Sequence, residues 1–219
     1  MTVVVDASAD RLRAVARAAA ALGAGRLVVL PTDTVYGVAA DAFNPAATAR
    51  IFLAKARSRR LPLPVLVYSP TQLAGIVAEV PAAGEWLMAA YWPGPLTLVL
   101  AAQDNLAWDL GDAAGTVAVR MPLDEVALDV IRAVGPLAVT SANRTGEPAA
   151  NDVTAARAAL GDDVDVYVDD GPRRNATPST ILDLTRSEPL LIREGDLPSD
   201  EVMAVARGER AGPPSAAGA

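Results

Sequence analysis

Short apolar runs alternate with longer stretches of helical periodicity along most of this 219-residue chain. The apolar runs predict strands at 27–30, 64–68, 95–100, 116–120, 136–141, 164–168, 179–184 and 189–193. The periodic stretches predict helices at 9–22, 46–56, 82–91, 123–134, 152–160 and 199–207. Alternating strands and helices are typical of α/β proteins, and the run of strands late in the chain indicates a mixed sheet. The pattern therefore predicts an α/β fold built on a mixed sheet.

The composition sets the kind of core that this fold can have. Hydrophobic residues make up 52% of the chain but aromatic residues only 4%, so the core must consist mostly of Ala, Val and Leu. No stretch has the composition of a domain linker, and the final AGPPSAAGA lacks an apolar pattern. We expect one domain over residues 1–208, followed by a disordered tail over 209–219.

The chain contains no cysteine and no histidine. This excludes disulfides, thiolate nucleophiles, zinc sites made of Cys and His, and imidazole bases such as that of a Ser-His-Asp triad. Catalysis must therefore use Lys, Arg, carboxylates, hydroxyls, backbone amides or a bound hard cation. The net charge of −7 disfavours a nucleic-acid interface over the whole surface, so any anion site should be a local basic pocket.

The N-terminal MTVVVDASAD has neither the basic region nor the apolar region of a signal peptide. Two charge-free stretches, 61–78 and 86–103, approach the length of a membrane span, but prolines interrupt both. We expect buried globular segments there, no membrane association and a cytoplasmic location.

Lys55 is the only lysine of the chain, and the other basic residues are all arginine. A cation near the end of a helix is often a solvated group that the helix dipole favours. An ammonium kept in an arginine-rich chain can instead indicate a compact phosphate ligand, and Arg57 could add a bidentate contact. Composition alone leaves both interpretations open.

Three other polar segments follow predicted strands, namely 31–45, 139–148 and the stretch from 178 to Arg193. Ligands bind at strand ends in α/β sheets, which favours a functional role for these segments. Each could also be an ordinary turn whose polar side chains bind their own backbone. Neither a GxxxxGK[ST] loop nor a GxGxxG loop is present, so a phosphate site would be of another kind.

Taken together and in this order, the segments resemble the YrdC/TsaC family of threonylcarbamoyl-AMP synthases. The resemblance covers roughly residues 10–205. The matching motifs are PTDTVYG (31–37), KAR (55–57), YWPGPLTLVL (91–100), TVAVRMP (116–122), SAN (141–143), STILDL (179–184) and IREG (192–195). Each motif is weak by itself, whereas the ordered set is highly specific.

The resemblance implies an open, twisted mixed sheet with flanking helices around a deep cavity that has a positive wall. It also implies a reaction in which L-threonine, bicarbonate and ATP give threonylcarbamoyl-AMP and pyrophosphate, for the t6A modification of tRNA. Mg²⁺ would accompany ATP, and threonylcarbamoyl-transfer proteins would use the product. The length resembles the short, single-domain form of the family.

The same resemblance implies a set of site residues. Lys55 and Arg57 match the KxR that faces the nucleotide phosphates, where fixed cations would stabilise the leaving pyrophosphate. The nucleotide set is Lys55, Arg57, Thr116, Ser141, Asn143 and Arg193. The threonine set is Thr34, Arg120 and Ser179, with Arg120 as the partner of the carboxylate. No residue is implied as a metal ligand.

The sequence also departs from the family. Many relatives have Asn-Pro-Leu after the KxR and a histidine a few residues on, where this chain has Leu61-Pro62-Leu63 and Leu66. The middle residue of the KxR is Ala56 in place of glycine. Other groups must therefore satisfy the substrates near residues 61–66.

Two other functions are open at this stage. A YrdC-like domain could be a double-stranded RNA or tRNA-binding module without catalysis, in which Arg57, Arg59 and Arg60 contact phosphates. The net charge of −7 disfavours this interpretation and leaves at most weak tRNA binding. The same domain type occurs in carbamoyltransferases of hydrogenase maturation, but those chains are longer and have zinc-finger parts, which a chain without cysteine lacks.

Overall fold

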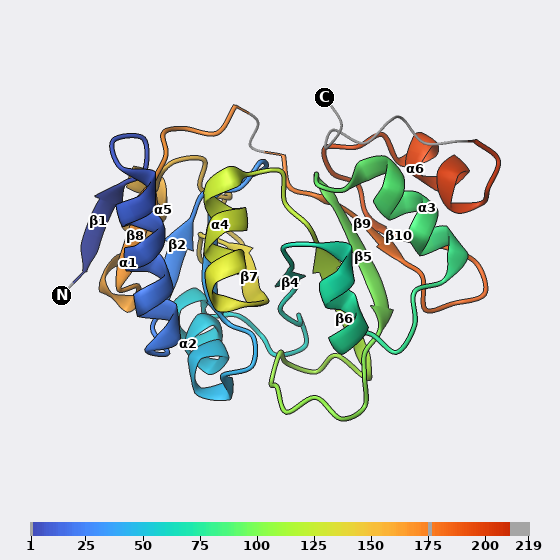
Figure 1. The fold of residues 1–219 in the computed structure, drawn as a ribbon, viewed down its shortest axis with the longest axis horizontal. Helices are drawn as coiled ribbons and strands as arrows, with labels where there is room; N and C mark the ends of the chain where they lie inside the picture. Colours follow the sequence, from blue (N-terminus) through green and yellow to red (C-terminus); the bar gives the residue numbers. More distant parts are fainter. Residues whose placement is uncertain (1, 175–176, 211–219) are drawn as a thin grey trace.

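A single mixed sheet of ten strands runs through the part of the chain that the structure describes (Figure 1). The structure is a computed structural model, and it describes residues 2–174 and 177–210. The strand order is β1-β8-β2-β3-β7-β4-β6-β5-β9-β10. The strands are β1 (Val3–Asp6), β2 (Val28–Leu30), β3 (Gly37–Asp41), β4 (Val65–Leu66), β5 (Leu96–Ala101), β6 (Thr116–Arg120), β7 (Leu137–Ser141), β8 (Val166–Asp169), β9 (Thr180–Asp183) and β10 (Leu190–Arg193).

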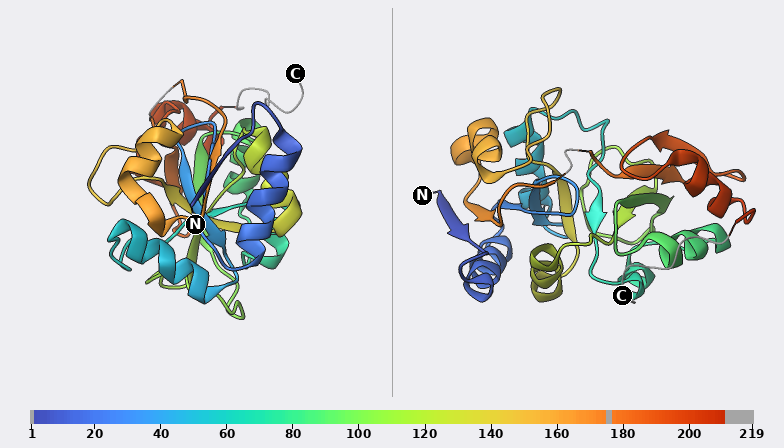
Figure 2. Two further views of the ribbon diagram at one scale, coloured as in Figure 1. Left: turned by 90° about the vertical axis from the view of Figure 1, so that its left-hand side faces the viewer. Right: turned by 90° about the horizontal axis from the view of Figure 1, so that it is seen from above.

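Helices cover both faces of this sheet. They are α1 (Arg11–Gly23), α2 (Pro45–Lys55), α3 (Ala82–Tyr91), α4 (Glu125–Val134), α5 (Val153–Leu160) and α6 (Ser199–Ala206), with short 3₁₀ turns η1 (Pro70–Gly75) and η2 (Gly161–Asp163). Around the β1–β7 half of the sheet, α1 and α4 lie on one face, and α2 and α5 on the other (Figure 2). Helices α3 and α6 pack together at the far end (Figure 1).

Helix starts follow from local capping residues. The side chains of Asp10, Asn44, Asp124 and Asp152 each accept a hydrogen bond from a backbone N–H in the first turn of α1, α2, α4 and α5. Such caps satisfy donors that a helix cannot satisfy internally. Helix α2 ends at Lys55, and the next residue, Ala56, adopts a left-handed conformation with φ of 49°. The caps thus fix where each helix begins, and Ala56 turns the chain sharply just after Lys55.

The core consists of aliphatic side chains, as the composition predicts. Val28, Val29 and Leu30 are all buried, as a central strand covered on both faces requires. The buried residues form two clusters, one on each face of the sheet. Among the described residues, no helix has the length and apolarity needed to cross a membrane.

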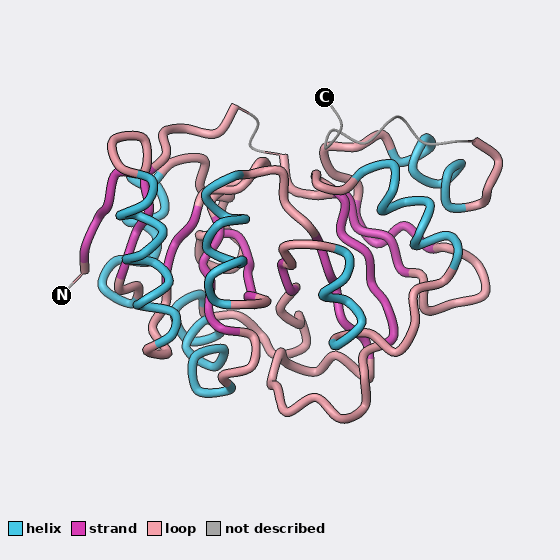
Figure 3. The backbone as a smooth tube through the Cα atoms, viewed as in Figure 1, coloured by secondary structure: helices cyan, strands magenta, loops and turns pink. Residues whose placement is uncertain are grey.

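The α/β class, the mixed sheet and the six predicted helices are confirmed. The prediction omitted β1, η1 and η2, and it left β3 unassigned within the polar segment 31–45. Figure 3 colours the chain by the helices, strands and loops that the structure has. Strand β3 has the sequence GVAAD, whose small residues carry little strand preference by themselves. Gly37 is needed there, because a Cβ would lie 2.6 Å from Val139 Cγ1 on the neighbouring strand. Most of the tail that we expect to be disordered, residues 211–219, lies outside the described residues.

Candidate anion site

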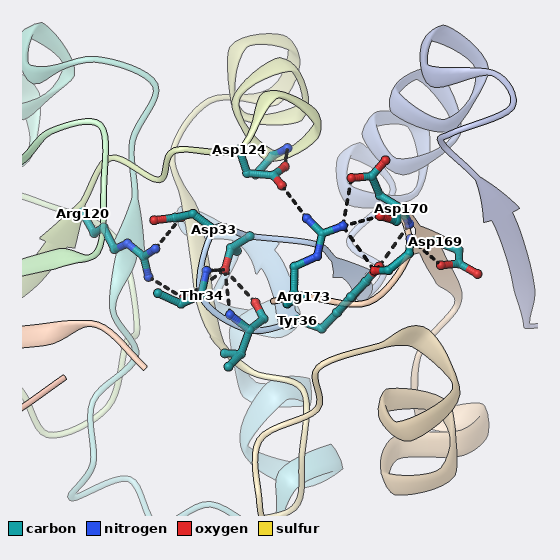
Figure 4. Close-up of polar contacts among 12 residues, drawn as sticks. Asp33, Thr34, Tyr36, Arg120, Asp124, Asp169, Asp170 and Arg173 are labelled. Atoms are coloured by element: carbon teal, nitrogen blue, oxygen red, sulfur yellow. Dashed lines mark hydrogen bonds and ion pairs between the residues drawn. The ribbon is translucent and has the colours of Figure 1, made fainter. Parts of the chain in front are cut away.

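The connection between β2 and β3 places polar side chains beside the end of β6. The Thr32 hydroxyl donates to Val35 O (2.6 Å) and accepts from Thr34 N (3.2 Å), which folds the chain into a tight turn. This turn holds Asp33 and Thr34 against Arg120, the last residue of β6 (Figure 4). Segment 31–37 is therefore more than a loop that binds its own backbone.

Arg120 is buried and uses its guanidinium to hold three neighbours. Nε donates to Gly94 O (2.9 Å), Nη1 donates to Thr34 Oγ1 (3.1 Å), and Nη2 forms an ion pair with Asp33. Burial lowers the pKa of Arg120, and the charge of Asp33 opposes that shift. Arg120 and Thr34, both predicted to lie around the amino acid, are thus in direct contact.

Lys55 is not a solvated helix end. Its side chain is buried, and Nζ donates to the backbone carbonyls of Ser141 and Asn143 and, at 3.4 Å, to Asn143 Oδ1. The Asn143 amide in turn donates to Arg144 O (2.9 Å) and Glu147 O (2.7 Å), which fixes loop 141–147. Burial, and then the charge of Arg57, lower the pKa of Lys55 to about 8. The structure therefore brings together Lys55, Ser141 and Asn143, three residues predicted to bind the nucleotide.

Arg57 donates hydrogen bonds to the stretch 61–66, where the sequence departs from the family pattern. Nε donates to Leu61 O (2.7 Å) and Nη2 to Pro62 O (3.1 Å). Burial lowers the pKa of Arg57, and the charge of Arg193 lowers it further. Backbone carbonyls of the divergent stretch thus hold this guanidinium in place.

Arg193, at the end of β10, lies against Ser179. Nη2 donates to Ser179 O (2.7 Å) and is 3.2 Å from Ser179 Oγ, which also lies 2.8 Å from Thr97 Oγ1. Gly195 allows this approach, because a Cβ there would lie 2.3 Å from Ser179 C. Thr97 is not among the predicted site residues, although its hydroxyl stands out in the otherwise apolar PLTLVL.

Lys55, Arg57, Arg193 and Arg120 form a basic cluster in an otherwise acidic protein. The charge of Arg57 lowers the pKa of Lys55, that of Arg193 lowers the pKa of Arg57, and that of Arg120 lowers the pKa of Arg193. Each cation therefore lies within electrostatic reach of the next, although they come from three separate parts of the sequence. An arrangement of this kind is stabilised by an anion such as a phosphate or a carboxylate.

Thr116 lies apart from Arg120 along β6. It is the first residue of the strand, about 13 Å from Arg120 at the usual rise per residue, and its hydroxyl donates to Ala113 O (2.7 Å). The described contacts do not join Thr116 to the basic cluster, so its role with the nucleotide stays a prediction.

A second polar network, which sequence reasoning did not predict, adjoins the first (Figure 4). Arg173 forms ion pairs with Asp124 (3.0 Å) and Asp170 (2.9 Å), and its guanidinium lies over the ring of Tyr36. The Tyr36 hydroxyl donates to Gly171 O (2.7 Å). The network ties the segment after β8 to segment 31–37 and to the start of α4.

The described cavities lie away from the basic cluster. A cavity of about 450 Å³ lies between segment 184–189 and the end of α6, and one of about 460 Å³ lies between β1 and α5. The deep cavity implied by the family resemblance stays a prediction. Within residues 2–174 and 177–210, no group of three or more Asp or Glu side chains is arranged to hold a metal ion.

Comparisons with known proteins point to one family. The Sua5/YciO/YrdC family model, described as "Telomere recombination", matches residues 20–195. A relative from Mycobacterium leprae, named provisionally as a threonylcarbamoyl-AMP synthase, is 51% identical over 186 residues, which are 85% of this chain and 84% of that one. The threonylcarbamoyl-AMP synthase of Pyrococcus abyssi is 38% identical over 182 residues, 83% of this chain and 54% of that one.

A solved structure agrees with these relatives. The crystal structure of P. abyssi Sua5 complexed with L-threonine has a TM-score of 0.87 at 35% identity, over 94% of this chain. This chain spans only 60% of the length of that one. The sheet and its flanking helices are thus those of the Sua5 structure over nearly all of this chain.

Proposed function

This chain belongs to the Sua5/YciO/YrdC family, and on that premise we propose that it is a threonylcarbamoyl-AMP synthase. The reaction condenses L-threonine, bicarbonate and ATP into threonylcarbamoyl-AMP and releases pyrophosphate, which makes the enzyme a nucleotidyltransferase. Its product serves the t6A modification of tRNA through proteins that transfer the threonylcarbamoyl group. The cytoplasm, where tRNA is modified, is the expected location.

The observation that carries this proposal is the basic cluster. Lys55 lies at one end of it, in contact with Ser141 and Asn143 and within electrostatic reach of Arg57, and Arg120 lies at the other end, in contact with Thr34. A substrate with three phosphates and a substrate with one carboxylate need two such anion-binding regions side by side. The cluster supports a nucleotide at the Lys55 end and threonine at the Arg120 end.

At the nucleotide end, Lys55 and Arg57 act on the β and γ phosphates. Negative charge grows on these phosphates as the bond to the α phosphorus breaks, so fixed cations stabilise the transition state more than the ground state. With a pKa of about 8, most Lys55 side chains carry the ammonium at neutral pH. Ser141, Asn143, Arg193 and Thr116 complete the nucleotide set.

At the amino-acid end, Arg120 binds the threonine carboxylate, and Thr34 and Ser179 lie around the rest of the molecule. The α-ammonium of threonine first loses a proton, and the free amine then attacks CO₂ with loss of a second proton, or bicarbonate with loss of water, to give a carbamate. A carbamate oxygen then attacks the α phosphorus in line and displaces pyrophosphate. Neither step needs a covalent enzyme intermediate, which suits a chain without Cys or His. Positioning of the reactants can lower the barrier by up to about 7–11 kcal/mol in favourable cases.

Mg²⁺ would enter with ATP, where it neutralises phosphate charge and aligns the phosphate oxygens. The described residues offer no carboxylate cluster to hold the ion by themselves, so the phosphates would supply most of its ligands. The residues of the basic cluster would orient the phosphates.

The alternative of an RNA-binding module fits the structure less well. Lys55 and Arg120 are buried, so a duplex could not place its phosphates against them. Arg59, which is more exposed, forms an ion pair with Asp109. Weak tRNA binding through Arg60 and its surroundings is the most that these contacts support.

The test is incubation with ATP, Mg²⁺, bicarbonate and each of several amino acids in turn. We expect pyrophosphate release that depends on both bicarbonate and L-threonine, and an acyl-adenylate with the mass of threonylcarbamoyl-AMP. Parallel reactions without bicarbonate serve as the control. Release that does not need an amino acid, or tRNA binding with a steep salt dependence and no turnover, would contradict the proposal.

A further inference from the structure

Asp33 uses only half of its hydrogen-bonding capacity. Its side chain is 12% exposed, and Oδ1 accepts from Arg120 Nη2. Oδ2 is buried and has no hydrogen-bond partner among the described residues. A buried carboxylate oxygen without a donor is costly, and such atoms in native proteins call for an explanation.

Neighbouring cations do not supply the missing donor. Arg173 directs its guanidinium to Asp124 and Asp170, away from Asp33 (Figure 4). Arg193 directs its guanidinium to Ser179. Asp33 is thus a buried carboxylate with one cation, Arg120, and one unused oxygen.

Arg120 has N–H donors that are not used in the described contacts. A guanidinium carries five N–H groups, and those of Arg120 make three described hydrogen bonds, to Gly94 O, Thr34 Oγ1 and Asp33. One N–H on each Nη atom is left over. Arg120 and Asp33 therefore present spare donors and a spare acceptor next to each other.

Electrostatics decides what kind of ligand fits this pair. The carboxylates of Asp33, Asp196 and Asp124 lie within electrostatic reach of Arg120, where their charges oppose the lowering of its pKa by burial. A carboxylate without a positive group would bind Arg120 but meet repulsion from Asp33. A ligand that carries a carboxylate and an ammonium together avoids this repulsion and satisfies both residues.

We propose that Asp33 binds the α-ammonium of the amino-acid substrate while Arg120 binds its carboxylate, so that the pair selects a zwitterion. The inference rests on the proposed function, since it concerns the same amino-acid site. The carboxylate can turn about its Cβ–Cγ bond, so either oxygen can accept from the ammonium while the other keeps Arg120. Asp33 is thereby a specificity residue, and hydroxy acids are rejected because they lack the positive group.

The experiment compares two ligands on two proteins. One ligand is L-threonine, and the other is 2,3-dihydroxybutyrate of the same configuration, in which a hydroxyl replaces the amine. Calorimetry measures the affinity of each ligand for the unaltered chain and for Asp33→Asn. A charge-assisted hydrogen bond of about 1.5–3 kcal/mol corresponds to a preference of roughly ten- to a hundredfold for threonine. We expect that preference in the unaltered chain, and a preference below about threefold in Asp33→Asn, with ATP affinity unchanged in both.

A structural role for Asp33 would give a different result. If Asp33 only held Arg120 in place, Asp33→Asn would weaken both ligands by the same factor, and the preference for threonine would persist. That outcome overturns the inference, and so does equal binding of the two ligands by the unaltered chain, a measurement that does not depend on how the variant folds. Asp109→Asn, which removes the partner of Arg59 on the surface, is the matched control and should keep the full preference.

Failure of the inference can be told apart from failure of the proposed function. If the unaltered chain forms threonylcarbamoyl-AMP but Asp33→Asn keeps the preference for threonine, only the role of Asp33 is wrong. If the unaltered chain neither binds threonine nor releases pyrophosphate with it, the proposed function itself is wrong.

Discussion

The two ends of the basic cluster hold their cations in different ways. Lys55 is buried against neutral acceptors, the carbonyls of Ser141 and Asn143, whereas Arg120 is buried against the carboxylate of Asp33. Burial, and then the charge of Arg57, lower the pKa of Lys55 to about 8, and no carboxylate among the described residues forms an ion pair with it. Burial also lowers the pKa of Arg120, but there the charge of Asp33 opposes the shift. On the proposed function, this difference suits a strongly negative ligand at the Lys55 end and a ligand of no net charge at the Arg120 end.

The largest effect is expected from the removal of Lys55, the cation that has no carboxylate partner among the described residues. Lys55→Ala should lower ATP-dependent pyrophosphate release by about 100- to 1,000-fold, because charge on the leaving phosphates loses its fixed partner. Threonine affinity and the fold, followed by thermal unfolding, should change far less. Arg60→Ala removes an exposed charge near the same helix and should leave turnover unchanged; near-normal turnover in Lys55→Ala would refute the role of Lys55.

Removal of Arg120, the cation paired with Asp33, should affect the use of threonine rather than that of ATP. Arg120→Ala should raise the threonine KM by roughly thirtyfold or more, a loss of about 2 kcal/mol or more, with little change in the ATP KM. It should also cost about 3–5 kcal/mol of unfolding free energy in a denaturant titration, because Asp33 would be left buried without its partner. Arg210→Ala, which breaks an exposed pair with Glu201, should cost at most about 1 kcal/mol. An unchanged threonine KM would count against the role of Arg120.

The depressed pKa of Lys55 predicts a pH dependence at one end only. Because the protonated ammonium binds phosphate, kcat/KM for ATP should be highest below the pKa of about 8 and fall as pH rises through it. The decline should approach about tenfold per pH unit. Lys55→Arg keeps its charge over this range, so its profile, although lower, should be flat from neutral pH upward. A decline of equal size in Lys55→Arg would assign the titration to another group.

The smallest effect concerns the hydroxyls between the two ends. Thr97→Val removes the partner that lies 2.8 Å from Ser179 Oγ, and should cost about 1 kcal/mol of unfolding free energy and raise the threonine KM by roughly fivefold. Thr185→Val, which removes an exposed hydroxyl from Asp183, is a matched control for the loss of a threonine hydroxyl. A rise in the ATP KM alone would place Ser179 at the nucleotide end instead.

Much of the fold follows from local patterns that the sequence displays directly. Helices α1, α2, α4 and α5 begin at capping side chains, and the central strands are continuous apolar runs. Strand β3 escaped prediction because its small residues show no strand pattern of their own. It forms because Gly37 and its neighbours fit between β2 and β7, a fit that local propensity does not contain.

The sequence by itself determined the fold class, the aliphatic core, the exclusion of thiol and imidazole chemistry, and the ordered motifs that identify the family. Only the tertiary structure decided which polar groups meet. Lys55 and Asn143 are 88 positions apart, and Asp33 and Arg120 are 87 apart, so neither contact has a local signature. Both depend on a sheet whose strand order differs from the chain order, which brings distant strand ends together at one site.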